Sequence, residues 1–146
     1  MKIEEIEAEW AKDAVIKSTD LGSEALNIPR LHSKWYGILL NEKRIFHGLT
    51  VRKDELTILL EGYFGKTLTL EELKEAGLPD YSDKKILKPD IPKHIATHAE
   101  MIKLNLKIAV QSDKIEFLKD IIKTIHGRSF LIKDAIEFQK FQAGSY

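Results

Sequence analysis

One short stretch of the sequence has residue types typical of phosphate chemistry. Gly65, Lys66 and Thr67 match the last three residues of a phosphate-binding loop, in which backbone amides and a lysine hold nucleotide phosphates. The full motif also needs a glycine at position 60, where this chain has leucine, and a strand before the loop, where the residue pattern predicts a helix. The tripeptide alone therefore does not predict nucleotide hydrolysis.

Two histidines have the spacing of a zinc-binding helix. His94 and His98 are four residues apart, but a metalloprotease helix has glutamate after the first histidine, and Ile95 stands there. No third ligand is evident, so both are interpreted as ordinary helix-surface residues. Cysteine is absent, which excludes thiol catalysis and disulfides. The chain is predicted not to be an enzyme, and no cofactor or metal is expected.

Basic residues near aromatic residues indicate a nucleic-acid surface. The chain has 23 Lys and Arg against 23 Asp and Glu, so any such surface must be a local patch. Cations near rings suit single-stranded nucleic acid, because charges attract phosphates and rings stack on bases. Scattered lysines that serve solubility, and a Tyr63 that packs inside the protein, remain the alternative. The cations lie near Tyr63, Phe64 and His47 and are Lys43, Arg44, Arg52, Lys53 and Lys66.

The strongest helical pattern lies in residues 91–125. Eight positions recur there in steps of three and four, the period of a helix that packs along a stripe. They are Met101, Leu104, Ile108, Gln111, Ile115, Leu118, Ile122 and Ile125. Other apolar residues extend beyond the stripe, so this helix needs more than one neighbour, in the same chain or in other copies. Gln111 either fixes the register and oligomer number or marks a place where the stripe turns outward.

The residues after this helix predict a return segment. Gly127 is expected to end the long helix, with a turn over residues 126–129, and Ser129 to cap a last short helix. Leu131, Ala135 and Phe138 would share one face of that helix, bordered by Phe141. The C-terminal part is therefore predicted to be a helical hairpin with one long and one short arm.

The N-terminal half also reads as helical. Residues 3–16 predict a short acidic amphipathic helix, and residues 31–63 a second long helix with the same three-and-four spacing, begun by Asn27 and Pro29. Thr69 and Glu72 form a capping box that starts a short helix ending at Gly77.

The predicted fold class is all-α, with two long helices whose stripes resemble those of coiled coils. The predicted division is an N-terminal module at 1–77, a linker at 78–90 and a C-terminal hairpin at 91–146. Because residues 1–7 are acidic and no apolar run is long enough, neither a signal peptide nor a membrane span is expected.

Several stretches resemble the UvsY recombination mediators of T-even-type bacteriophages. The resemblance covers nearly the whole chain in the right order and is most specific in the C-terminal half. It rests on residues 16–21, 31–35, 62–66, 71–73, 102–107 and 127–138.

The resemblance implies a non-enzymatic accessory protein that binds single-stranded DNA in the cytoplasm of an infected host cell. It would help a RecA-like recombinase, UvsX, replace the single-stranded DNA-binding protein. It would form a ring of about six or seven copies, with the C-terminal helices as the oligomerising part and the N-terminal module as the DNA-binding part. The predicted oligomerisation residues are the eight stripe positions with Phe138 and Phe141. The competing function is a coiled-coil structural adaptor without nucleic-acid binding.

One departure from the family concerns the DNA contacts. Where the family's familiar member has a lysine and an arginine, this chain has Ile58 and Leu60. Lys34, in the matched stretch at 31–35, therefore joins Arg52, Lys53 and Lys66 as a substitute contact.

Overall fold

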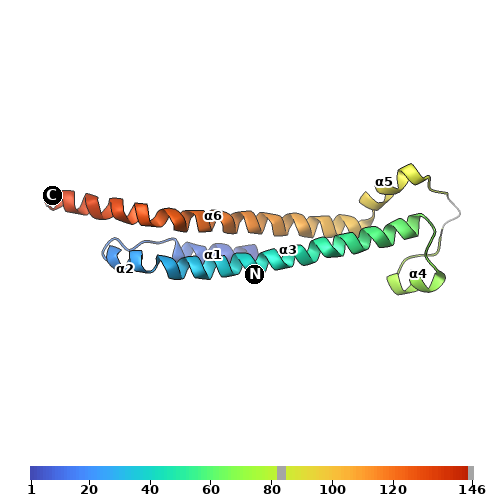
Figure 1. The fold of residues 1–146 in the computed structure, drawn as a ribbon, viewed down its shortest axis with the longest axis horizontal. Coiled ribbons are helices and arrows are strands. Elements are labelled where there is room, and N and C mark those ends of the chain that lie inside the picture. The colour runs from blue at the N-terminus through green and yellow to red at the C-terminus, as the bar shows by residue number, and fades with distance from the viewer. Residues whose placement is uncertain (82–84, 145–146) are drawn as a thin grey trace. The chain divides into compact units, whose positions relative to one another are not determined.

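The computed structural model describes residues 1–81 and 85–144. Within them the chain forms helices and no strand, which confirms the predicted all-α class. The helices are α1 (Ile3–Asp13), α2 (Leu21–Leu26), α3 (Ile28–Phe64), α4 (Leu70–Ala76), the 3-10 helix η1 (Lys88–Asp90), α5 (Ile91–Ala96) and α6 (Ala99–Gln142) (Figure 1). Among these residues no helix combines the length and the hydropathy that crossing a bilayer requires.

The two long helices predicted from the apolar spacing are α3, with 37 residues, and α6, with 44. Gly48 lies inside α3 without interrupting it. The capping box is also confirmed, because the Glu72 amide donates to the Thr69 hydroxyl over 3.2 Å and the Thr69 amide to the Glu72 carboxylate over 3.0 Å. Gly77 ends α4 in the left-handed region, at a φ of 67°.

The predicted C-terminal hairpin is wrong. Helix α6 runs without a turn through residues 126–129, so Ser129 caps nothing and no return helix exists. Gly127 remains helical at a cost of about 1 kcal/mol relative to alanine. Arg128 lies in the predicted turn, but its side chain is buried and continues the inward face of α6 together with Ile125 and Ile132.

The predicted helix over residues 91–125 is likewise divided, into α5 and α6. The Thr97 hydroxyl donates to the Lys93 carbonyl over 2.9 Å at the end of α5. The His98 carbonyl accepts from the Ile102 amide, and His98 Nδ1 accepts from the Glu100 amide over 3.2 Å, so His98 caps α6. Asp90, which precedes α5, makes no side-chain cap bond.

The chain forms two compact units that differ from the predicted division. Unit 1 combines Met1–Arg44 with Gln111–Tyr146, and unit 2 is Ile45–Val110. The N-terminal and C-terminal stretches, predicted as separate modules, thus share one unit. The predicted linker contributes η1 to unit 2, and its residues 82–84 lie outside the described residues.

Unit 1 is built around Trp35 of α3, which is fully buried. Its indole N–H donates to the Asp13 carboxylate over 3.0 Å, and Trp10 of α1 meets it edge to face with ring centroids 5.6 Å apart. Helix α1 therefore lies beside α3 (Figure 1). The other buried apolar side chains of this unit are Ile6, Leu21, Leu31, Leu39, Ile115, Leu118, Ile121, Ile125 and Ile132.

Unit 2 has a smaller core. Leu60, Ile95 and Met101 are buried together, from α3, α5 and α6. The partly buried side chains packed against them are Leu56, Phe64, Leu78 and Ile91. The segment after α4 is tied down by Tyr81, whose hydroxyl donates to the Leu68 carbonyl and accepts from the Leu68 amide, over 2.8 and 2.7 Å.

Candidate nucleic-acid interface

Four of the predicted cations lie between residues 43 and 53 of α3. Arg44, Arg52 and Lys53 are exposed and Lys43 is half-buried. Ion pairs within the described part of the chain involve other cations and none of these four. Their charges are therefore available to an external anion. Lys43 and Arg44 belong to unit 1, whereas Arg52 and Lys53 belong to unit 2.

Lys34, which also lies on α3, forms its ion pairs within unit 1. Its ammonium pairs with Glu9 at 3.2 Å and with Asp13 at 2.6 Å, and lies 5.3 Å from the centre of the Trp35 ring. The hydrogen bond to Asp13 raises the pKa of Lys34. Two carboxylates already neutralise this charge, so Lys34 stabilises the contact between α1 and α3.

The segment around Lys66 does not form a phosphate cradle. The amides of Gly65, Lys66 and Thr67 donate to the carbonyls of Glu61, Tyr63 and Gly62, so none of them is left for a nucleotide. The preceding element is α3, a helix where the motif needs a strand. Lys66 itself is exposed and lines a cleft of about 690 Å³ together with Lys85 and Lys88.

The aromatic residues near this segment contact one another. The ring of Tyr63 lies 5.2 Å from that of Phe64 and 5.7 Å from that of Tyr81, and Phe64 lies 5.4 Å from His94. Tyr63 and Phe64 are both half-buried. Their rings are thus partly used inside unit 2, which agrees with the alternative interpretation of Tyr63.

The two positions that depart from the family differ in structure. Ile58 is 69% exposed on α3, whereas Leu60 is fully buried in the core of unit 2. A cation at position 60 of this chain would have to leave that core, because a buried unpaired charge is strongly unfavourable. The leucine therefore contributes to packing, and the cationic surface of this chain must lie elsewhere.

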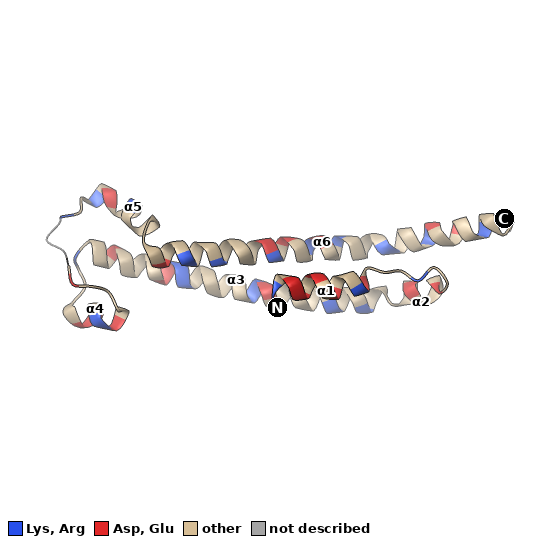
Figure 2. Cartoon of the chain, turned by 180° about the vertical axis from the view of Figure 1, so that it is seen from behind, with Lys and Arg blue, Asp and Glu red and all other residues tan. Residues whose placement is uncertain are grey.

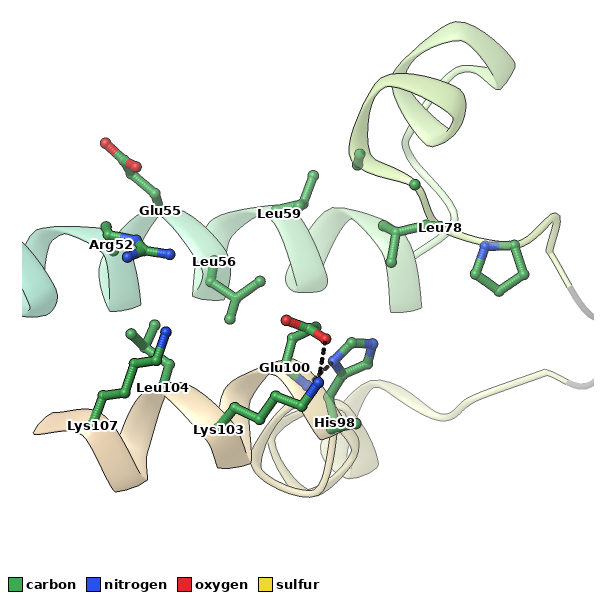
Figure 3. A pocket seen from close by; sticks show the side chains of 14 residues that line it. Arg52, Glu55, Leu56, Leu59, Leu78, His98, Glu100, Lys103, Leu104 and Lys107 are labelled. Carbon is green, nitrogen blue, oxygen red and sulfur yellow. Dashed lines mark hydrogen bonds and ion pairs between the residues drawn. The ribbon is translucent and has the colours of Figure 1, made fainter. Parts of the chain in front are cut away.

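A second cleft, of about 680 Å³, lies within unit 2 and was not predicted from the sequence (Figure 3). Arg52 of α3 lines it together with Lys103 and Lys107 of α6. The two lysines are four residues apart, so they lie on one side of α6. The four-residue spacing of Lys103 and Lys107 is the one sign of this cleft in the sequence, and it does not show that Arg52 lies opposite them. We call this site the α3–α6 cleft.

Most of the predicted oligomerisation residues are buried in their own chain. Met101, Leu104, Gln111, Ile115, Leu118 and Ile125 are buried, and Ile108 and Ile122 are half-buried. A buried side chain has no surface left for a neighbouring subunit, so these residues stabilise the fold. Phe138 and Phe141 are each 61% exposed.

The positions of His94 and His98 do not fit the zinc-binding motif. His94 belongs to α5 and His98 caps α6, so they do not share one helix face as the zinc motif requires. In the described part of the chain, no three His, Asp or Glu side chains lie close enough together to hold a metal ion.

The distribution of charge and the fold define a class of protein. Figure 2 shows Asp and Glu gathered on α1 and Lys and Arg spaced along α3 and α6. An all-α chain that exposes unneutralised cations on a long helix has a surface of the kind that nucleic-acid-binding proteins use.

The chain belongs to the UvsY family. The family model described as "Recombination, repair and ssDNA binding protein UvsY" matches residues 9–145. The recombination protein uvsY of Enterobacteria phage T4 is 25% identical over 145 residues, which cover 99% of each chain.

Solved structures show the same fold. Two crystal structures of the bacteriophage T4 recombination mediator protein UvsY, in lattice types II and IV, each match with a TM-score of 0.79. The first is 21% identical and covers 98% of both chains, and the second is 19% identical and covers 97% of this chain and 99% of the other. The expected family and the all-α fold class are thus confirmed.

Proposed function

We propose that this chain is a recombination mediator that binds single-stranded DNA and promotes loading of a RecA-like recombinase in place of the single-stranded DNA-binding protein. The observation that supports this best is the family match over residues 9–145. The exposed, unpaired cations of α3 supply the phosphate contacts that such a function needs.

We also propose that the chain acts as a ring-like homo-oligomer. Its net charge is +0, so one subunit offers only a few local phosphate contacts. Repeating the α3 cations around a ring multiplies those contacts on one strand and raises avidity without any new chemistry. The proposal therefore explains how a near-neutral subunit binds a polyanion.

A titration of the wild-type protein tests DNA binding. Fluorescence anisotropy of a labelled oligothymidylate is expected to show binding that weakens as salt rises, since each phosphate contact releases a counterion. Lys43→Gln with Arg44→Gln should weaken binding, whereas Lys34→Gln should change it little, because Glu9 and Asp13 already neutralise Lys34. Absence of binding at low salt would leave the structural adaptor as the function.

Recombinase loading needs its own assay. On an oligonucleotide already coated with single-stranded DNA-binding protein, addition of this protein is expected to shorten the delay before the recombinase hydrolyses ATP. The same addition on bare DNA should change the delay much less. An equal delay with and without the protein on coated DNA would contradict the mediator function.

The exposed aromatic residues at the end of α6 give a prediction about assembly. Phe138→Ser combined with Phe141→Ser is expected to lower the solution mass, because burying two phenylalanines between subunits contributes about 1.5–3 kcal/mol each. Both are exposed, so the helix content should not change. Analytical ultracentrifugation checks the mass, and Phe130→Ser, an exposed residue outside the predicted set, is the control. An unchanged mass in the double variant would remove the assembly role.

A further inference from the structure

Three elements of unit 2 form the α3–α6 cleft. The lining residues of α3 are Arg52, Glu55, Leu56 and Leu59, and those from the end of α4 and the segment after it are Ala76, Gly77, Leu78 and Pro79. The others are His98, which caps α6, and Ala99, Glu100, Lys103, Leu104 and Lys107 of α6. The lining is thus partly aliphatic and partly charged, and both long helices contribute charged side chains.

Two cations face one another across this cleft. Figure 3 shows the side chains of Arg52 and Lys107 extending toward each other from α3 and α6, while Glu55 points away. Neither Arg52 nor Lys107 forms an ion pair with another described residue. Two positive side chains that face each other with no carboxylate between them repel, and an anion bound between them removes that repulsion.

Lys103 is the third cation of the cleft. It forms a long ion pair with Glu100, at 3.5 Å, and both side chains are exposed. Such an exposed pair contributes little to stability, so a phosphate can replace Glu100 as the partner of Lys103.

We propose that the α3–α6 cleft holds the phosphodiester backbone of single-stranded DNA, with Arg52 and Lys107 on one phosphate and Lys103 on the next. Leu59 and Leu78 offer the deoxyribose an apolar surface. His98 has the only aromatic ring among the described residues of the lining, so the contact reads backbone charge and not base stacking. This inference rests on the proposed function and names its site.

Charge-removing variants test the proposal on the full-length protein. In oligothymidylate titrations near 0.1 M salt, Arg52→Gln and Lys107→Gln are each expected to weaken binding by about fivefold, the effect of one lost counterion release. The double variant should lose less than the product of the single losses, because both cations hold the same phosphate. Lys119→Gln with Lys123→Gln removes the same charge from exposed α6 positions outside the cleft and serves as the matched control.

A second variant should strengthen binding. Glu100→Gln releases Lys103 and removes a negative charge from the cleft, so affinity is expected to rise about two- to threefold. Glu116→Gln is its matched control, since Glu116 pairs with Lys119 in the same three-residue spacing of α6, at 3.1 Å. A gain of affinity in both variants would show only a general charge effect and would contradict the specific role of Lys103.

The possible outcomes distinguish a failure of the proposed cleft from a failure of the proposed function. If the wild-type protein shows no salt-sensitive binding, the proposed function and the cleft both fail. If it binds and the Arg52–Lys107 double variant equals its control, the function stands and the cleft is not the DNA site. Direct binding of labelled polyglutamate to the wild-type protein that is lost in this double variant, while the DNA affinity is unchanged, would assign the cleft to an acidic protein segment instead.

Discussion

Replacing Arg128 with methionine is expected to lower the free energy of unfolding by about 3–5 kcal/mol, the usual result of removing one partner from a buried ion pair. Arg128 is only 4% exposed, and its partner Glu24 is 17% exposed at the side chain. The guanidinium and the carboxylate lie 3.0 Å apart. Methionine fills similar volume but leaves Glu24 without its cation.

The same guanidinium also holds backbone groups. Nη1 donates to the Asp13 carbonyl over 3.0 Å and Nη2 to the Val15 carbonyl over 3.1 Å. These carbonyls lie where α1 ends, beyond the last helical hydrogen bonds, and need external donors. The variant removes three bonds that join α1, α2 and α6 of unit 1.

Urea unfolding followed by circular dichroism measures the effect. Protein concentration must be fixed, because oligomerisation links stability to concentration. Arg128→Lys should lose less, since it keeps the charge but not the two-pronged geometry. Arg30→Met is the control, because Arg30 is exposed and, among the described residues, its guanidinium donates only to Asn27. A loss under about 1 kcal/mol for Arg128→Met would contradict the anchoring role.

Arg128 also shows what the sequence could not predict. Local signals predicted well: the capping box at Thr69, the helix end at Gly77 and the apolar spacing of α3 depend on a few neighbouring residues, and all were confirmed. Whether Gly127 and Arg128 form a turn or stay helical depends on the carbonyls of Asp13 and Val15, which lie more than a hundred positions away in the sequence. A neighbouring glycine and arginine look like a turn until those distant acceptors are known.

The predictions for the candidate site also succeeded where residue type was sufficient and failed where distant residues decide. Residue type was enough to select Arg52 and Lys53, whose charges remain available. It was not enough to exclude Lys34, because the carboxylates of Glu9 and Asp13 that neutralise it come from another helix. Lys107 was missed because its significance depends on facing Arg52.

Gln111→Leu is expected to lower the free energy of unfolding by about 2–3 kcal/mol, because it takes a donor from a buried charged group. Gln111 is buried, and its amide donates to the carbonyl of Glu42 over 2.9 Å and to the Glu42 carboxylate over 2.6 Å. Glu42 is fully buried in unit 1. Leucine keeps the volume but cannot donate.

This geometry changes what Gln111 is expected to do. Its polar side chain in an apolar stripe suggested a role in register and oligomer number, whereas Glu42 of the same chain accounts for its polarity. We therefore expect lower stability with an unchanged solution mass. A shifted mass at unchanged stability would restore the interface role instead. Ser112→Ala, at the half-buried position next to Gln111, is the control.

The response to pH separates a lost donor from a simple packing defect. Burial raises the pKa of Glu42, but hydrogen bonds from Gln111 and the Met1 ammonium, with the charge of Lys114, outweigh it and hold the pKa below its ordinary value of 4.5. The Met1 ammonium lies 3.0 Å and Lys114 3.6 Å from the carboxylate. The stability from ionised Glu42 is thus present above its unfolded pKa and lost as pH falls through the lower folded pKa.

In Gln111→Leu one of the groups that lowers this pKa is gone, so the folded pKa rises and Glu42 protonates earlier on acidification. The difference in unfolding free energy between wild type and variant should therefore be largest at neutral pH and shrink as pH falls. Urea titrations across this range, on protein with a free amino group at Met1, measure it. Glu42→Gln has no carboxylate to titrate, so Gln111→Leu added to that background should show a constant difference. A difference that stays constant in the wild-type background would indicate a packing defect alone.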